Sequence, residues 1–206
     1  MAKTNNGIVF LVFLIIMFII TYLQQEFVLL PELHSLDIVG DDTKIELIRR
    51  FQQMRWLAFL LGPLLLLLRL VLVTLCLFIA GFFFNEMEGN TFGSWWGVAL
   101  KAQIVMVAYS VFLCVANLVL APDTVVKIST YSSLLFLCNG DTEAWVRLPL
   151  AAINFVEVLY WTALTFFVGK LCNTSFGKSF RFVLSSYGVG YLFYLSLLIF
   201  LLLYLT

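Results

Sequence analysis

Long apolar runs separated by shorter polar stretches dominate this chain, and their lengths predict its main elements. A helix needs about 20 mainly apolar residues to cross the roughly 30 Å hydrocarbon core of a bilayer. Five stretches meet that requirement: residues 7–23, 56–84, 94–120, 148–169 and 182–205. Because a backbone in lipid must satisfy its own hydrogen bonds, we expect each stretch to be a helix. The pattern therefore predicts an all-α, polytopic membrane protein that forms one membrane domain over residues 1–206.

Two polar intervals carry weaker helical patterns. Residues 41–55 place Ile45, Ile48 and Phe51 at helical spacing with arginines between them. This spacing is typical of an amphipathic helix at the membrane surface, and a partner-binding helix is the alternative. Residues 124–137 fit either a half-inserted segment or a docked surface helix.

The composition supports a membrane protein and narrows its partners. The chain is 63% hydrophobic and 12% charged, whereas soluble domains are about half apolar and a quarter charged. Its net charge is zero, which gives no reason to expect nucleic acid as a partner. The expected partners are the lipid bilayer and other membrane proteins or further copies of the chain. Five lysines and arginines fall on the side of the amino terminus and six on the other, so this balance does not decide orientation.

The residues that usually carry chemistry are few and dispersed. The four cysteines are Cys76, Cys114, Cys138 and Cys172, without a C-x-x-C pair, so we expect neither a disulfide framework nor a zinc site. His34 lies near Glu32 and Asp37. These three residues could form a weak metal site, but a solvated loop histidine is the better interpretation. Nucleotide, hydrolase and metalloprotease motifs are missing from the sequence. We therefore expect no enzyme activity, cofactor or metal.

Two segments resemble each other and predict an internal repeat. Asn90-Thr91 followed by Phe92-Gly93 matches Asn173-Thr174 followed by Phe176-Gly177. The second and third spans would then form one helical hairpin, and the fourth and fifth spans a second one. Both hairpins would enter the membrane from the same side, as in a parallel repeat.

The same alignment pairs two charged residues within apolar runs. When Gly81 is set against Gly169, Thr74 falls on Thr162 and Arg69 on Glu157. A charge at the bilayer centre costs at least about 2.5–3.5 kcal/mol, so it normally faces a counter-charge, a partner or water.

Arg69 and Glu157 are therefore predicted to form an ion pair near the middle of their spans. Asn154 precedes Glu157 by three residues and would share its helix face. The alternatives are a proton or ion path that uses Glu157, and pairing of either charge with another subunit.

Small residues at four-residue spacing mark candidate helix contacts. Gly93 and Gly97 have this spacing in the third span, and Ser186 and Gly190 have it in the fifth. Such residues let helix backbones approach closely, either within the chain or between copies.

The last four spans, over roughly residues 56–206, resemble the Yip superfamily, five-helix membrane proteins named for interaction with Ypt/Rab GTPases. The resemblance rests on the F-G turn before the third span and on an acid-x-x-x-W helix followed by glycine and a small polar turn. Glu157, Trp161, Gly169 and Ser175 occupy those places. The chain's size is similar to that of short bacterial relatives, which implies a bacterial inner membrane and a cytoplasmic amino terminus. The long interval over residues 24–55 departs from the family pattern.

These observations favour a non-enzymatic integral membrane protein that acts as a scaffold or accessory subunit of a membrane assembly. One alternative is a small transporter or permease component that uses Glu157 at the bilayer midplane. A further alternative is a membrane immunity or stress-tolerance protein.

Overall fold

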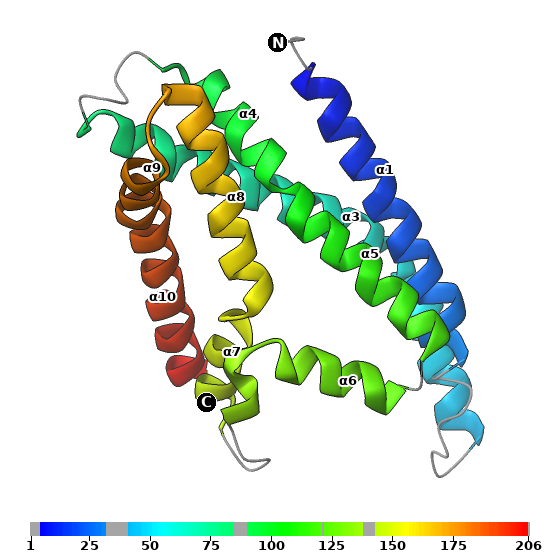
Figure 1. Cartoon of the computed structure of the whole chain (residues 1–206). Coiled ribbons are helices and arrows are strands. Elements are labelled where there is room, and N and C mark those ends of the chain that lie inside the picture. Colours follow the sequence, from blue (N-terminus) through cyan, green and yellow to red (C-terminus); the bar gives the residue numbers. More distant parts are fainter. Residues whose placement is uncertain (1–4, 32–40, 85–89, 121, 138–142, 206) are drawn as a thin grey trace. The chain divides into compact units, whose positions relative to one another are not determined.

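The computed structural model describes residues 5–31, 41–84, 90–120, 122–137 and 143–205, and these residues are predominantly helical (Figure 1). Among these residues, five helical segments are long and apolar enough to cross a membrane. They are Asn6–Leu29, Ile48–Gly81, Phe92–Val119, Phe155–Cys172 and Phe176–Tyr204. The prediction of an all-α, polytopic membrane protein is confirmed.

Several of the segments contain more than one helical element. In chain order these are α1 (Asn6–Gln24), the π-helical turn η1 (Gln25–Leu29), α3 (Asp41–Gly81), α4 (Phe92–Ala102), α5 (Ile104–Val119), α6 (Pro122–Tyr131), the 3₁₀ turn η3 (Leu134–Leu137), α7 (Ala144–Ala152), α8 (Phe155–Cys172), α9 (Phe176–Val183), the π-helical turn η4 (Leu184–Gly188) and α10 (Val189–Leu205). The helix of the fifth span starts at Phe176, ahead of the predicted apolar run over residues 182–205, and it includes Lys178 and Arg181.

The described residues fall into two compact units. The first comprises residues up to 69 together with 107–125, and the second comprises residues 70–106 together with those from 126 onward. Both α3 and α5 contribute to both units. The single membrane domain over residues 1–206 stays a prediction.

In the first unit, α1 packs against α3 through apolar rings and small residues. Phe18 stacks on Phe59, with ring centroids 6.3 Å apart. A Cβ atom at Gly62 would lie 3.8 Å from the Thr21 hydroxyl oxygen, so this position tolerates close approach of the two helices.

The amphipathic segment predicted over residues 41–55 is the amino-terminal part of α3. This helix continues from Asp41 to Gly81 as one element of 41 residues. Ile45, Gln52 and Trp56 are exposed on this part of the helix. The segment is therefore a direct extension of the second span and not a separate helix.

In the second unit, the two predicted hairpins share structural details that support the repeat. The helices α4 and α9 begin at the matched residues Phe92 and Phe176. A Cβ at Gly81 would meet the Trp95 ring at 3.5 Å, and one at Gly169 would meet the Ser179 hydroxyl at 3.1 Å. Because Trp95 and Ser179 each follow the matched phenylalanine by three residues, these two contacts are equivalent.

The burial pattern extends this equivalence along the third and fifth spans. The matched pairs with both members buried are Trp95 and Ser179, Val98 and Phe182, Ala99 and Val183, Ala102 and Ser186, and Gln103 and Tyr187. The incoming helices match less well, because Thr74 is fully buried whereas Thr162 is exposed. The repeat is thus supported most strongly by the turns and the outgoing helices.

The four small residues predicted at helix contacts differ in their surroundings. Gly190 approaches Cys76 of α3, whose Sγ would lie 2.7 Å from an added Cβ. Gly97 and Ser186 are both buried. Gly93 is exposed at the start of α4, where an added Cβ would meet only the Thr91 hydroxyl, at 3.9 Å, among the described residues. A contact of Gly93 with another copy of the chain stays a prediction.

The contact between α3 and α10 predicts an efficient engineered cross-link. In Gly190→Cys, the new Cβ would lie 3.9 Å from the Cβ of Cys76, close to the mean of about 3.8 Å found in disulfides. With Cys114, Cys138 and Cys172 replaced by serine, we expect mild oxidation to protect most of both thiols from maleimide. Gly177→Cys is the matched control, because it faces open space. Equal maleimide labelling of the two variants would contradict the helix pairing.

Candidate functional site

The fourth span is interrupted where the sequence predicts a continuous helix over residues 148–169. Ile153 and Asn154 adopt extended backbone conformations between α7 and α8. The side-chain oxygen of Asn154 accepts a 2.8 Å hydrogen bond from the Glu157 backbone N–H, as a helix N-cap does. Asn154 therefore caps α8. The three-residue spacing had predicted that it shares a helix face with the Glu157 side chain, and this prediction is wrong.

A second irregular segment satisfies the backbone at this break. The Leu134 N–H donates to the Ile153 carbonyl at 2.9 Å, and the Phe155 N–H donates to the Ser132 carbonyl at 2.8 Å. Ser133 and Asn154 form the bridge between the two segments, and Ser133 is buried. Irregular backbone at membrane depth is tolerated only where protein or water satisfies it. Here the chain itself supplies the partners.

Glu157 lies in the first turn of α8 and is 6% exposed. The Tyr187 hydroxyl of η4 donates to its Oε1 at 2.6 Å, and the Trp161 indole N–H donates to the same oxygen at 3.1 Å. The carboxylate therefore links the fourth span to the fifth. Its depth within the bilayer, predicted near the middle of the span, stays a prediction.

Aromatic rings surround the Glu157 carboxylate. Tyr187 packs edge-on against Tyr160 and Trp161, with centroids 5.6 and 5.8 Å apart. Tyr191 contacts Trp161 and Tyr187, and its hydroxyl donates to the Ala152 carbonyl at 2.7 Å. That bond satisfies a carbonyl in the last turn of α7. The cluster therefore joins the helix break to the fifth span through rings with polar ends.

Arg69, the predicted partner of Glu157, belongs to the first unit, whereas Glu157 belongs to the second. The predicted Arg69–Glu157 pair therefore stays a prediction. It is tested by exchanging the two residues. Recovery of the fold in the exchanged protein, when each single exchange fails to fold, would support the pair.

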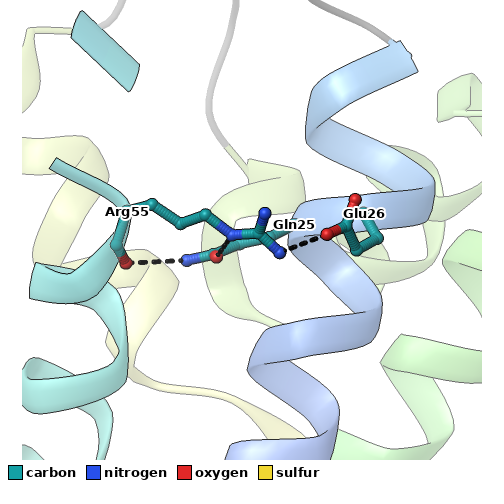
Figure 2. A network of polar contacts seen from close by, with 3 residues as sticks. All are labelled: Gln25, Glu26 and Arg55. Carbon is teal, nitrogen blue, oxygen red and sulfur yellow. Dashed lines mark hydrogen bonds and ion pairs between the residues drawn. The ribbon is translucent and has the colours of Figure 1, made fainter. Parts of the chain in front are cut away.

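A second polar cluster lies in the first unit, where η1 meets α3 (Figure 2). Arg55 donates from Nε to the side-chain oxygen of Gln25 at 2.8 Å and from its terminal nitrogen to Glu26 at 2.5 Å. Gln25, which is 2% exposed, donates in turn to the Arg55 carbonyl at 3.3 Å. The guanidinium carbon also lies 5.9 Å from the Tyr22 ring centroid.

The Arg55 cluster fixes the carboxyl end of the first span against α3. Its guanidinium suits this role because its donors are arranged in a rigid, planar fork. The sequence pointed to Arg55 only as one of several arginines in residues 41–55, and it gave no sign that Gln25 and Glu26 would contact it.

The sequence also missed the two donors to Glu157. Trp161 follows Glu157 by four residues, a spacing that places side chains together on a helix, so this contact could have been predicted from the sequence. For Tyr187 the only signal in the sequence is the repeat, in which it occupies the same position as another polar residue, Gln103.

The structure offers no cluster of three or more histidine, cysteine, aspartate or glutamate residues for a metal among the described residues. His34 and Cys138 lie outside the described residues.

With this geometry established, the chain was compared with known proteins. No family model, curated protein or solved structure matches it.

Proposed function

We propose that this integral membrane protein is a non-catalytic scaffold or accessory subunit, and that it binds its partner through the part of α3 outside the bilayer. The observation that carries the proposal is the length of α3. Its 41 residues give about 61 Å at about 1.5 Å per residue, roughly twice the hydrocarbon thickness.

Tilt does not accommodate this length. Phe82, Phe83 and Phe84 follow Gly81, and polar residues begin at Asn85, so the end of α3 lies near one edge of the membrane. Even at a tilt of about 40°, the steepest usual value, the helix would still cover about 47 Å along the bilayer normal. Its amino-terminal part therefore extends beyond the hydrocarbon core.

The extended part of α3 carries an apolar side chain that the hydrocarbon core would not cover there. Ile45, Arg49 and Gln52 recur at spacings of three and four, so they share one face of the helix, and Ile45 is 64% exposed. Trp56 continues this face at the edge of the hydrocarbon core and is 60% exposed. A mixed apolar and basic face outside the lipid is what a protein partner would cover. The Arg55 cluster supports this role, because it holds the base of the extension against η1.

Site-specific photo-crosslinking in native membranes tests this proposal. A benzophenone amino acid at Gln52 should give a discrete protein adduct, whose mass distinguishes another membrane protein from a second copy of the chain. The same group at Leu64, which is exposed within the span, is the lipid-facing control. If Gln52 and Leu64 both give lipid adducts alone, the partner-binding role is wrong.

Transport is the second candidate, and the break between α7 and α8 favours it. Discontinuous helices line substrate sites in many transporters. Against it, Oε1 of Glu157 and the N–H of Phe155 already bind groups of the chain. Proton flux into liposomes, followed with an entrapped pH dye, tests a path through Glu157. Abolition of that flux by Glu157→Gln would support transport, and unchanged flux would exclude the path.

On the resemblance alone, we further propose that the chain is a short member of the Yip superfamily in a bacterial inner membrane, with its amino terminus in the cytoplasm. Attachment of a reporter enzyme to each terminus tests the orientation. Five spans predict that the two reporters report opposite sides.

A further inference from the structure

A buried amide oxygen in the third span lacks a hydrogen-bond donor. Gln103 separates α4 from α5 and is 4% exposed. Its Oε1 has no hydrogen-bond partner among the residues that the structure describes. Buried polar atoms almost always have a partner, either protein or ordered water, and in lipid the need is stronger. The orphaned oxygen therefore points to an occupant that donates a hydrogen bond.

The repeat supplies an independent reason to expect a polar interaction at Gln103. Its match in the second hairpin is Tyr187, which donates to Glu157. Both residues lie where the helix is irregular, Gln103 between α4 and α5 and Tyr187 within η4. The same position therefore carries a buried polar side chain in both hairpins, as a donor in one and as an acceptor in the other.

The buried hydroxyls of the second unit direct their protons elsewhere. Three of them donate to a carbonyl four residues earlier in the same segment: Thr74 to Leu70 at 2.7 Å, Thr165 to Trp161 at 2.9 Å and Ser186 to Phe182 at 2.7 Å. Tyr187 donates to Glu157. Because no donor of the described residues reaches Gln103 Oε1, an occupant must bring its own O–H or N–H group. It must also be small, because Ala99 and Ala102 beside it are fully buried.

We propose that Gln103 binds a water molecule inside the third span. Buried waters typically make about three hydrogen bonds to polar groups that would otherwise be unsatisfied. Such a water accounts for the orphaned oxygen without placing an uncompensated charge in the span.

Solid-state NMR of the full chain in lipid bilayers tests the site directly. Glutamine labelled at the side-chain amide reports magnetisation transfer from water. Gln25 is the matched control, because it is similarly buried but its oxygen accepts from Arg55. We expect transfer from water to Gln103 to exceed transfer to Gln25 several-fold. Transfer to Gln103 no greater than that to Gln25 would overturn the proposal.

The variant Gln103→Met identifies the Gln103 signal and gives a second, independent result. If the oxygen lacks a donor, its removal relieves a buried unpaired group and raises the unfolding temperature. If the oxygen binds a donor, the variant loses a hydrogen bond and the unfolding temperature does not rise. A rise in the unfolding temperature would therefore overturn the proposal even if Gln103 cannot be resolved by NMR.

Discussion

Glu157→Ala is expected to destabilise the protein by about 2–4 kcal/mol, because it leaves two buried donors without an acceptor. Tyr187 and Trp161 both donate to the carboxylate, and each buried donor left unpaired costs about 1–3 kcal/mol. Interhelical hydrogen bonds in membranes contribute about 0.6 kcal/mol on average. The combined loss of the two bonds is therefore expected to be smaller than twice the largest cost of one unpaired donor. Unfolding in mixed detergent, followed by tryptophan fluorescence, measures the loss.

Two variants separate the hydrogen bonds of Glu157 from its charge. Glu157→Gln keeps an acceptor but removes the charge, whose burial is itself unfavourable, so we expect a change below about 1 kcal/mol. Glu46→Ala removes an exposed carboxylate that is ion-paired with Arg50 at 2.6 Å, and exposed pairs contribute about 0–1 kcal/mol. If Glu157→Ala proves as stable as Glu46→Ala, the carboxylate does not hold the two spans together.

Arg55→Ala is expected to cost about 1.5–3 kcal/mol and to loosen η1 from α3. The change deprives the nearly inaccessible Gln25 oxygen of its donor and removes the ion pair with Glu26. The side chains in that ion pair are 25% and 30% exposed, so screening by solvent limits its share and the unpaired amide contributes most. Thermal unfolding and hydrogen exchange of residues 22–29 measure the global and local effects.

Arg55→Lys and Arg50→Ala are the matched variants for this cluster. A lysine ammonium lacks the planar fork that binds two acceptors at once, so Arg55→Lys should recover only part of the stability. Arg50 is 73% exposed in its ion pair, so Arg50→Ala should change stability by less than about 0.5 kcal/mol. Faster exchange of residues 22–29 in Arg50→Ala than in Arg55→Ala would contradict the assigned role.

The number of spans was predictable because apolar run length and bilayer thickness together determine it. Their ends were less predictable, because caps and tertiary contacts set them. Asn154 illustrates the difficulty, since a residue three before Glu157 fits both a shared helix face and an N-cap. The cap is decided by the bond from the Glu157 N–H to Asn154. The flanking residues Ile153 and Phe155 are held by Leu134, which donates to Ile153, and by Ser132, which accepts from Phe155.

The candidate sites were predictable only in part. Glu157 was conspicuous as a carboxylate in an apolar run, but its donor Tyr187 lies thirty residues later in the chain. Gln25 and Arg55 are equally far apart, and a single sequence holds no signal that pairs them. The repeat was the exception, because the matching N-T and F-G turns correctly aligned the buried positions of the third and fifth spans.

The depth of α3 in the bilayer tests the central claim most directly. Spin labels at Ile45, Gln52, Trp56 and Leu64, placed one at a time in liposome-reconstituted protein, report access to a water-soluble nickel relaxant and to oxygen in the lipid. We expect Ile45 and Gln52 to be reached by nickel, Trp56 to lie near the transition and Leu64 to be reached by oxygen. Oxygen access at Ile45 and Gln52 equal to that at Leu64 would show that the whole helix lies in lipid, and would contradict the proposed partner-binding extension.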